Sequence, residues 1–200
     1  MVPAVTHKKK PTQLVSECAL LDRARDGDRQ AFSELISRHQ EGLAATVVAM
    51  LGPSNDVDDI VQETVIKFYH GLDRFRGEAA VGTYLKRMVI NRTLDVLRRR
   101  KRFLDRFVRT DEMVLTLVDP ERNGGQILEA EERKKMVRRA ISALNPKHRA
   151  VVVLRLIEGY STEETAQMLG IAYGTVLSRL SRAQKKIQVL LAPYMGEMPH

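Results

Sequence analysis

The segment that most constrains this fold is residues 161–182, STEETAQMLGIAYGTVLSRLSR, which carries the signals of two consecutive helices. Ser161 and Glu164 have the spacing of a capping box, in which each side chain bonds a backbone amide at the helix start. Gly170 follows an apolar pair, where a left-handed residue ends a helix without Cβ strain. We therefore predict a helix from Thr162 and a turn at Gly170.

A second helix is predicted to begin near Tyr173. Its apolar residues recur at helical spacing and are expected to be buried: Val176, Leu180 and Ala183. Its polar residues lie on the other side: Thr175, Ser178, Arg179 and Arg182. Two helices in this order are typical of a helix-turn-helix, whose second helix enters the major groove of DNA. The alternative is a pair of short surface helices in a protein that binds no nucleic acid.

The composition favours a polyanionic partner and a helical fold. The chain has 33 Lys and Arg against 25 Asp and Glu, a formal net charge of +8. Basic ribosomal and membrane-surface proteins share this balance. Charged residues make up 29% of the chain and alternating apolar runs are scarce, which favours helices almost throughout. With 5% aromatic residues and no Trp, a stacking platform for single-stranded RNA is disfavoured.

We expect an all-α fold of two small helical domains joined by a flexible linker, the second a wingless four-helix domain containing the helix-turn-helix. The 200 residues, 44% of them hydrophobic, suffice for one good core or two small ones. Cys18 is the only cysteine, which excludes an internal disulfide and a cysteine-based zinc cluster, and it is predicted to be a small core residue. No segment has the length of a membrane span, so a cytoplasmic location is expected.

The first half of the chain is predicted to contain four helices. The first covers residues 14–26 and ends at Gly27, and Asp28 caps the second, which stops before Gly52. The third begins at Asn55 or Asp56. The fourth covers residues 83–102, after which a polar, acidic segment is predicted to be a linker.

An acidic ridge is predicted on the third helix, where Asp59, Gln62 and Glu63 lie at positions i, i+3 and i+4. One interpretation is a solvated face whose acids complement the helix dipole. The other is a docking patch for a basic partner. A metal site is disfavoured, because the ridge has only two carboxylates and no nearby His.

The fourth predicted helix carries a polar stripe that ends in a basic run. The stripe consists of Arg87, Asn91, Asp95, Arg98 and Arg102. Cations at a helix C-terminus complement its dipole, but five in succession over 98–102 exceed that need. Because phosphates would relieve their mutual repulsion, we interpret the run as a nucleic-acid contact.

Several ordered signals extend over residues 14–191. They are Gly27-Asp28 with Ala31-Phe32, DDIVQE at 58–63, LDRFRG at 72–77, Asn91 with Asp95 and Arg98, GTV at 174–176, SRL at 178–180 and Arg182-Ala183. In this order and separation, they resemble the extracytoplasmic-function (ECF) sigma factors, the compact two-domain class of bacterial RNA polymerase initiation subunit. The resemblance implies a specificity subunit that helps open promoter DNA and is not itself an enzyme.

The resemblance also implies roles for individual residues. Those that dock on core RNA polymerase are Asp59, Gln62 and Glu63. Those that contact the minus-ten promoter element are Phe75, Arg76, Gly77, Tyr84, Arg87, Asn91, Arg98 and Arg102. Those that read the minus-thirty-five element are Thr175, Leu177, Ser178, Arg179, Ser181 and Arg182. An anti-sigma factor is an implied partner, whereas no cofactor, metal or catalytic residue is expected.

The implied organisation has five parts. A basic arm covers residues 1–13, the polymerase-binding and minus-ten domain 14–102, the acidic linker 103–128, the minus-thirty-five domain 129–192 and a tail 193–200.

Four residues depart from the family pattern or from good helix chemistry. Tyr84 stands where the family usually has Trp, and Leu177 where Arg is common. Leu cannot make the bidentate contact of Arg with guanine, although it can touch a thymine methyl. Ser181 occupies a reading position that varies. Ala172 is a poor cap for the second helix of the motif.

Two other functions remain open from the residues alone. One is an autonomous helix-turn-helix regulator, which would leave the acidic ridge and the basic fourth helix unrelated. The other is a DNA-processing enzyme, which would need a nucleophile or metal carboxylates in its first domain. No convincing set of either kind is present there.

Overall fold

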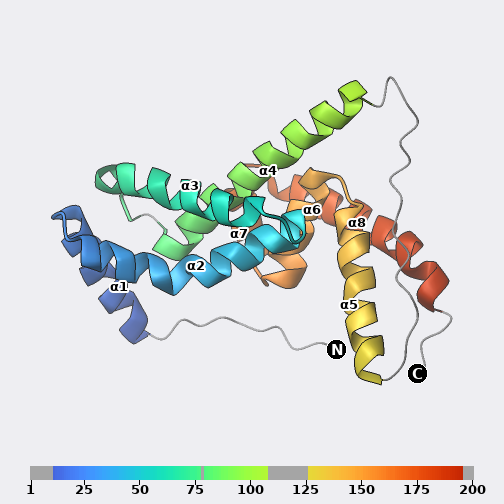
Figure 1. Ribbon diagram of the computed structural model, residues 1–200, viewed down its shortest axis with the longest axis horizontal. Helices are drawn as coiled ribbons and strands as arrows, with labels where there is room; N and C mark the ends of the chain where they lie inside the picture. The colour runs from blue at the N-terminus through green and yellow to red at the C-terminus, as the bar shows by residue number, and fades with distance from the viewer. Residues whose placement is uncertain (1–10, 78, 108–125, 196–200) are drawn as a thin grey trace.

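The computed structural model of the protein describes residues 11–77, 79–107 and 126–195 (Figure 1). The described residues form helices and no strand, which confirms the predicted all-α fold. The elements in chain order are α1 (Pro11–Arg25), α2 (Arg29–Leu51), α3 (Asp56–His70), the 3-10 turn η1 (Leu72–Arg74), α4 (Val81–Phe107), α5 (Gln126–Ser142), α6 (Pro146–Val152), the π-helical turn η2 (Val153–Ile157), α7 (Thr162–Leu169) and α8 (Tyr173–Met195).

Helices α1 to α4 form the first domain, and local signals set their limits. The Asp28 carboxylate accepts hydrogen bonds from the amides of Gln30 and Ala31 at 2.9 and 3.0 Å, which caps α2 as predicted. Gly52 ends the helix at a φ of 82°, a conformation that L side chains rarely adopt. Leu35 and Phe68 are among the fully buried side chains of this domain.

The extent of α4 and the position of Cys18 differ from expectation in the first domain. Helix α4 covers Val81–Phe107 instead of residues 83–102, because residues 103–107 contain no Gly or Pro that would stop it after the stripe. Cys18 is exposed instead of buried. The inward side of α1 carries Glu17, Leu20 and Ala24, and the buried Glu17 pairs with His39, so a charged residue interrupts the apolar pattern.

Helices α5 to α8 form the second domain, and here the predicted helix signals are confirmed. Ser161 and Glu164 make both hydrogen bonds of the capping box at the start of α7. Gly170 ends α7 in the left-handed conformation. The Asn145 side chain caps α6, where Pro146 occupies the first turn. Val176 and Ala183 of α8 are fully buried, as the helical spacing predicts.

The two domains pack against each other and share an apolar cluster. In Figure 1, α6 lies beside α2 and α4, and α7 lies beside α4. The second domain contributes Ala150, Val153, Leu154 and Met168 to the cluster that contains Leu43, Val47 and Met50 of α2. Helix extends into three segments predicted to be outside the domains: residues 11–13 of the basic arm, where α1 begins at Pro11 instead of residue 14, residues 103–107 and 126–128 of the linker, and residues 193–195 of the tail. The rest of the arm, linker and tail lies outside the described part of the chain.

Candidate nucleic-acid and partner interface

Two side chains of the acidic ridge on α3 are exposed to solvent, and the third is bonded to a residue of the same domain. Asp59 and Gln62 are exposed. Glu63 accepts two hydrogen bonds from the Arg92 guanidinium of α4, one from Nε and one of 2.9 Å from Nη2. Hydrogen bonding from Arg92 holds the pKa of the Glu63 carboxyl below its ordinary value of 4.5. Glu63 therefore joins α3 to α4, while Asp59 and Gln62 are available to a partner.

The loop between α3 and α4 has a buried anchor and an exposed part. The Phe75 ring lies 5.7 Å from Phe68 and 4.9 Å from Tyr84, centroid to centroid, and Phe75 is buried. Arg25 of α1 donates a hydrogen bond to the Phe75 carbonyl. Arg76 and Gly77 are exposed, and Gly77 has a φ of 73°. Of the three loop residues predicted to contact the minus-ten element, Phe75 is buried and anchors the loop, whereas Arg76 and Gly77 are exposed to solvent.

The polar stripe of α4 is exposed along Arg87, Asn91, Arg98 and Arg102. Arg98 pairs with Asp95 at 3.2 Å, a short-range pair between two exposed side chains. One member of the basic run at 98–102 is already paired within the domain: the Arg100 guanidinium donates a hydrogen bond of 2.5 Å to the Asp56 carboxylate at the start of α3. The outward side of α4 therefore presents an amide and several guanidinium groups in a row, a set that suits phosphates and bases.

The second helix of the helix-turn-helix, α8, presents a mixed surface. Leu177, Ser178, Ser181 and Arg182 are exposed, and Thr175 and Arg179 are half-buried. The structure thus brings all six residues of the sequence prediction onto one helix whose buried side packs into the domain. In place of a side-chain cap from Ala172, its backbone carbonyl accepts hydrogen bonds from the amides of Thr175 and Val176.

Three residues beside this surface were missed by the sequence prediction: Tyr173, Lys186 and His148. Tyr173 is an exposed aromatic side chain at the start of α8. Burial lowers the pKa of His148, and the positive charges of Arg179, Arg182 and Lys186 lower it further. His148 of α6 therefore borders the basic side of α8. The spacing of Arg182 and Lys186 at i and i+4 is the sequence signal that extends this side.

Among the described residues, no group of three or more His, Cys, Asp or Glu side chains is placed to hold a metal ion. No described helix combines the length and the apolar character of a membrane span.

Comparison with known proteins identifies the family. Residues 35–103 match the family described as sigma-70 region 2, and residues 134–187 match sigma-70 region 4. The ECF RNA polymerase sigma-E factor of Escherichia coli K12 is 32% identical, with 91% of this chain and 97% of the relative covered. The chain is an ECF sigma factor. This confirms the resemblance predicted from its motifs.

A second relative and two solved structures agree with this membership. The ECF RNA polymerase sigma factor SigM of Mycobacterium tuberculosis is 36% identical over 88% of this chain and 85% of the relative. The structure of CnrH in complex with the cytosolic domain of CnrY is similar, with a TM-score of 0.62, 29% identity, and coverage of 89% of this chain and 98% of CnrH.

The sigma factor RpoE, crystallised with the anti-sigma factor NepR from Bartonella quintana, shares the fold. Its TM-score is 0.60 at 24% identity, over 80% of this chain and 96% of RpoE. Within this ECF sigma factor, the α3 ridge and the α4 stripe lie in the part that matches region 2, and the α8 surface lies in the part that matches region 4.

Proposed function

We propose that this sigma factor binds core RNA polymerase through the open part of its acidic ridge, Asp59 and Gln62. Both side chains are exposed, and the Asp59 carboxylate gives this part of α3 a negative charge in a chain of net charge +8, while the Gln62 amide adds hydrogen-bonding groups. A basic surface on the polymerase would be attracted to it and oriented by it. Glu63 supports this surface from behind by fixing α3 on α4 through Arg92.

The minus-ten element is assigned to the α3–α4 loop and the stripe of α4. Arg76 and Gly77 form the exposed part of the loop, which Phe75 and Tyr84 hold in place from within the aromatic cluster. Exposed groups of the stripe then contact the separated strand: Arg87, Asn91, Arg98 and Arg102. Opening a base step takes a few kcal/mol, which contacts to a flipped base and to phosphates offset.

The minus-thirty-five element is assigned to α8. Its exposed polar groups reach base edges and phosphates, and Leu177, 46% exposed, offers an apolar contact that fits a thymine methyl. The helices that carry these surfaces belong to a first domain of residues 11–107 and a second domain of residues 126–195. As a specificity subunit, the protein itself makes or breaks no covalent bond, works beside the polymerase in the cytoplasm, and is regulated by an anti-sigma factor.

The observation that carries this proposal is the presence, in one chain, of an acidic ridge on α3 and of exposed polar and basic surfaces on α4 and α8, inside the parts that match the two sigma-70 regions. Runoff transcription with core polymerase tests it. Selective initiation at a cognate promoter is expected only when this protein is added. Tight operator binding without polymerase, and no selective initiation with it, would favour an autonomous regulator.

A matched pair of variants tests the docking surface. Asp59→Lys is expected to weaken binding to core polymerase at least tenfold, because it reverses the charge of an exposed ridge residue. Asp26→Lys makes the same charge change at an exposed turn residue outside the ridge. Equal affinities of the two variants for core polymerase, measured by co-purification and titration, would contradict the assignment.

A further inference from the structure

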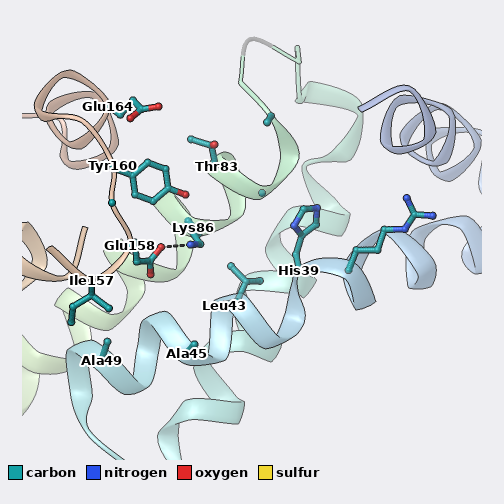
Figure 2. Close-up of a pocket in the computed structure, with 15 residues that line it drawn as sticks. His39, Leu43, Ala45, Ala49, Thr83, Lys86, Ile157, Glu158, Tyr160 and Glu164 are labelled. Atoms are coloured by element: carbon teal, nitrogen blue, oxygen red, sulfur yellow. Dashed lines mark hydrogen bonds and ion pairs between the residues drawn. The ribbon is translucent and has the colours of Figure 1, made fainter. Parts of the chain in front are cut away.

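A hollow of about 680 Å³ lies between α2, α4 and the turn before α7, and the Lys and Arg side chains that line it are matched within the protein (Figure 2). The Glu158 carboxylate accepts hydrogen bonds from the Lys86 ammonium of α4 and the Thr46 hydroxyl of α2. The Glu158 side chain is 10% exposed. Arg38 pairs with Glu34 at 2.5 Å. Both cations of this hollow therefore have a carboxylate partner in the chain itself.

A second hollow, a groove of about 400 Å³, lacks this match. It is formed by α4, α6, the turn after α7 and α8. Its lining includes four cationic side chains and no carboxylate: Arg98 and Lys101 of α4, Lys147 of α6 and Arg179 of α8. Of these four, only Arg98 forms an ion pair with a described residue, the exposed Asp95 at 3.2 Å. The groove therefore carries an excess of positive charge.

The neighbouring residue His148 responds to this excess. Burial lowers the pKa of His148, and the positive charges of Arg179, Arg182 and Lys186 lower it further. Arg179 is half-buried, so water and salt screen its charge less than that of an exposed side chain. An anion held in the groove would lower the electrostatic cost of gathering these cations.

The groove also has apolar walls and two carboxamide groups, from Asn91 of α4 and Asn145 before α6. The Asn145 side-chain oxygen accepts a hydrogen bond of 3.1 Å from the Lys147 backbone amide, which leaves the NH₂ group as a donor. Apolar walls with a few polar groups, in a volume of about 300–1,000 Å³, are typical of small-molecule sites. The half-buried apolar side chains of the lining are Leu94, Leu97, Pro146, Leu169 and Ile171.

We propose that this groove is a binding site for a nucleoside polyphosphate. The cations of three helices hold the phosphate chain, because each phosphate brings negative charge and strong acceptor oxygens. The base covers the apolar walls and turns its polar edge toward the carboxamides. An inorganic anion would leave the apolar walls uncovered, and a neutral molecule would leave the cations unmatched.

The site itself is independent of the proposed function, but one consequence rests on that function. Asn91, Arg98 and Arg179 line the groove and are also assigned to promoter contacts. A bound nucleotide would therefore compete with promoter DNA for these groups.

Calorimetric titration of the full chain with ATP tests the site. The titration is made at about 0.15 M salt, which screens diffuse attraction between exposed charges, and without divalent metal, so that the phosphates are not shielded. One saturable site is expected. Tripolyphosphate, titrated in the same way, is expected to bind at least fivefold more weakly, because it has no base to bury against the apolar walls.

A matched set of variants locates the binding. Lys147→Gln on α6 and Arg179→Gln on α8 are each expected to weaken ATP binding about fivefold, through loss of a charge-assisted hydrogen bond. Lys135→Gln removes the same charge at an exposed position of α5 that does not line the groove, and is expected to leave the affinity unchanged. Circular dichroism checks that each variant is folded.

Three results would overturn the site. One is the absence of saturable ATP binding, and another is equal ATP affinity of the two groove variants and Lys135→Gln. The third is equal affinity for ATP and tripolyphosphate, since the groove would then recognise only a phosphate chain, as it would that of a DNA backbone. Failure of the proposed function is distinguishable, because the titrations contain neither polymerase nor DNA, whereas that function is tested by runoff transcription.

Discussion

Replacing Arg149 by Met should destabilise the protein strongly, because one guanidinium serves the ends of two helices. Arg149 is 7% exposed. It donates to the Met50 carbonyl at the end of α2, and to the carbonyls of Ser142 and Leu144 at and just beyond the end of α5, the last at 3.2 Å. Burial of the guanidinium away from water lowers its pKa.

The size of the effect follows from the acceptors that remain. Met fills a similar length but donates no hydrogen bond, and a buried acceptor left unpaired costs about 1–3 kcal/mol. Three carbonyls lose their donor, while removal of a buried charge offsets part of the loss. We therefore expect Arg149→Met to lower the free energy of unfolding by about 3 kcal/mol. The carbonyls belong to the backbone, so the substitution cannot remove them together with their partner.

Urea unfolding followed by circular dichroism measures this loss. With a slope of about 2 kcal/mol per molar urea, the midpoint should fall by about 1.5 M. Arg138→Met, at an exposed position on α5, should leave the midpoint nearly unchanged. A fall of less than about 0.5 M for Arg149→Met would refute the reasoning, because the carbonyls would then have found other donors or water.

Two further predictions concern charge. Because the pKa of Glu63 is lowered mainly by its hydrogen bond from Arg92, this pair stabilises the fold above pH 4.5 and its contribution is lost as the pH falls through the lowered folded pKa. At 45% exposure, the pair contributes about 0.5 kcal/mol, so the stability difference between the native protein and Glu63→Gln should shrink from pH 6 to pH 3, and a constant difference would count against the pair. Arg182→Ala should lower minus-thirty-five-dependent transcription and reduce the salt dependence of DNA binding by about one unit of slope, whereas Arg138→Ala should change neither. Unchanged promoter output would remove Arg182 from the DNA surface.

Helix limits could be predicted from sequence because their signals act within one or two turns. The caps at Asp28 and at Ser161 with Glu164 bond backbone amides two or three residues away. Gly170 ends its helix through its own left-handed conformation. The same local logic placed the second helix of the helix-turn-helix and its buried side. It failed at Cys18, where Glu17 is buried on the inward side because it meets His39 on another helix.

The candidate site could be predicted only in part. Helical spacing places Asp59, Gln62 and Glu63 on one ridge, but it cannot show that Glu63 is engaged by Arg92, 29 positions later. Motif order places Phe75 in a promoter-contacting loop, but only the packing shows that its ring lies in the aromatic cluster. As a result, Asp59 is a sharper test of polymerase docking than Glu63, whose replacement also disturbs the packing of α3 on α4.

The sequence by itself determined that this chain is helical, where most of its helices begin and end, and which motifs mark it as a sigma factor. Those properties depend on neighbours within a few residues, or on residue types in a fixed order. The tertiary structure alone decided how the domains meet, because Thr46 and Glu158 are 112 positions apart and both must be ordered before they can bond. Nothing in the sequence distinguishes Glu158 from a solvent-exposed acid, yet in the structure its carboxylate is a buried contact between the two domains.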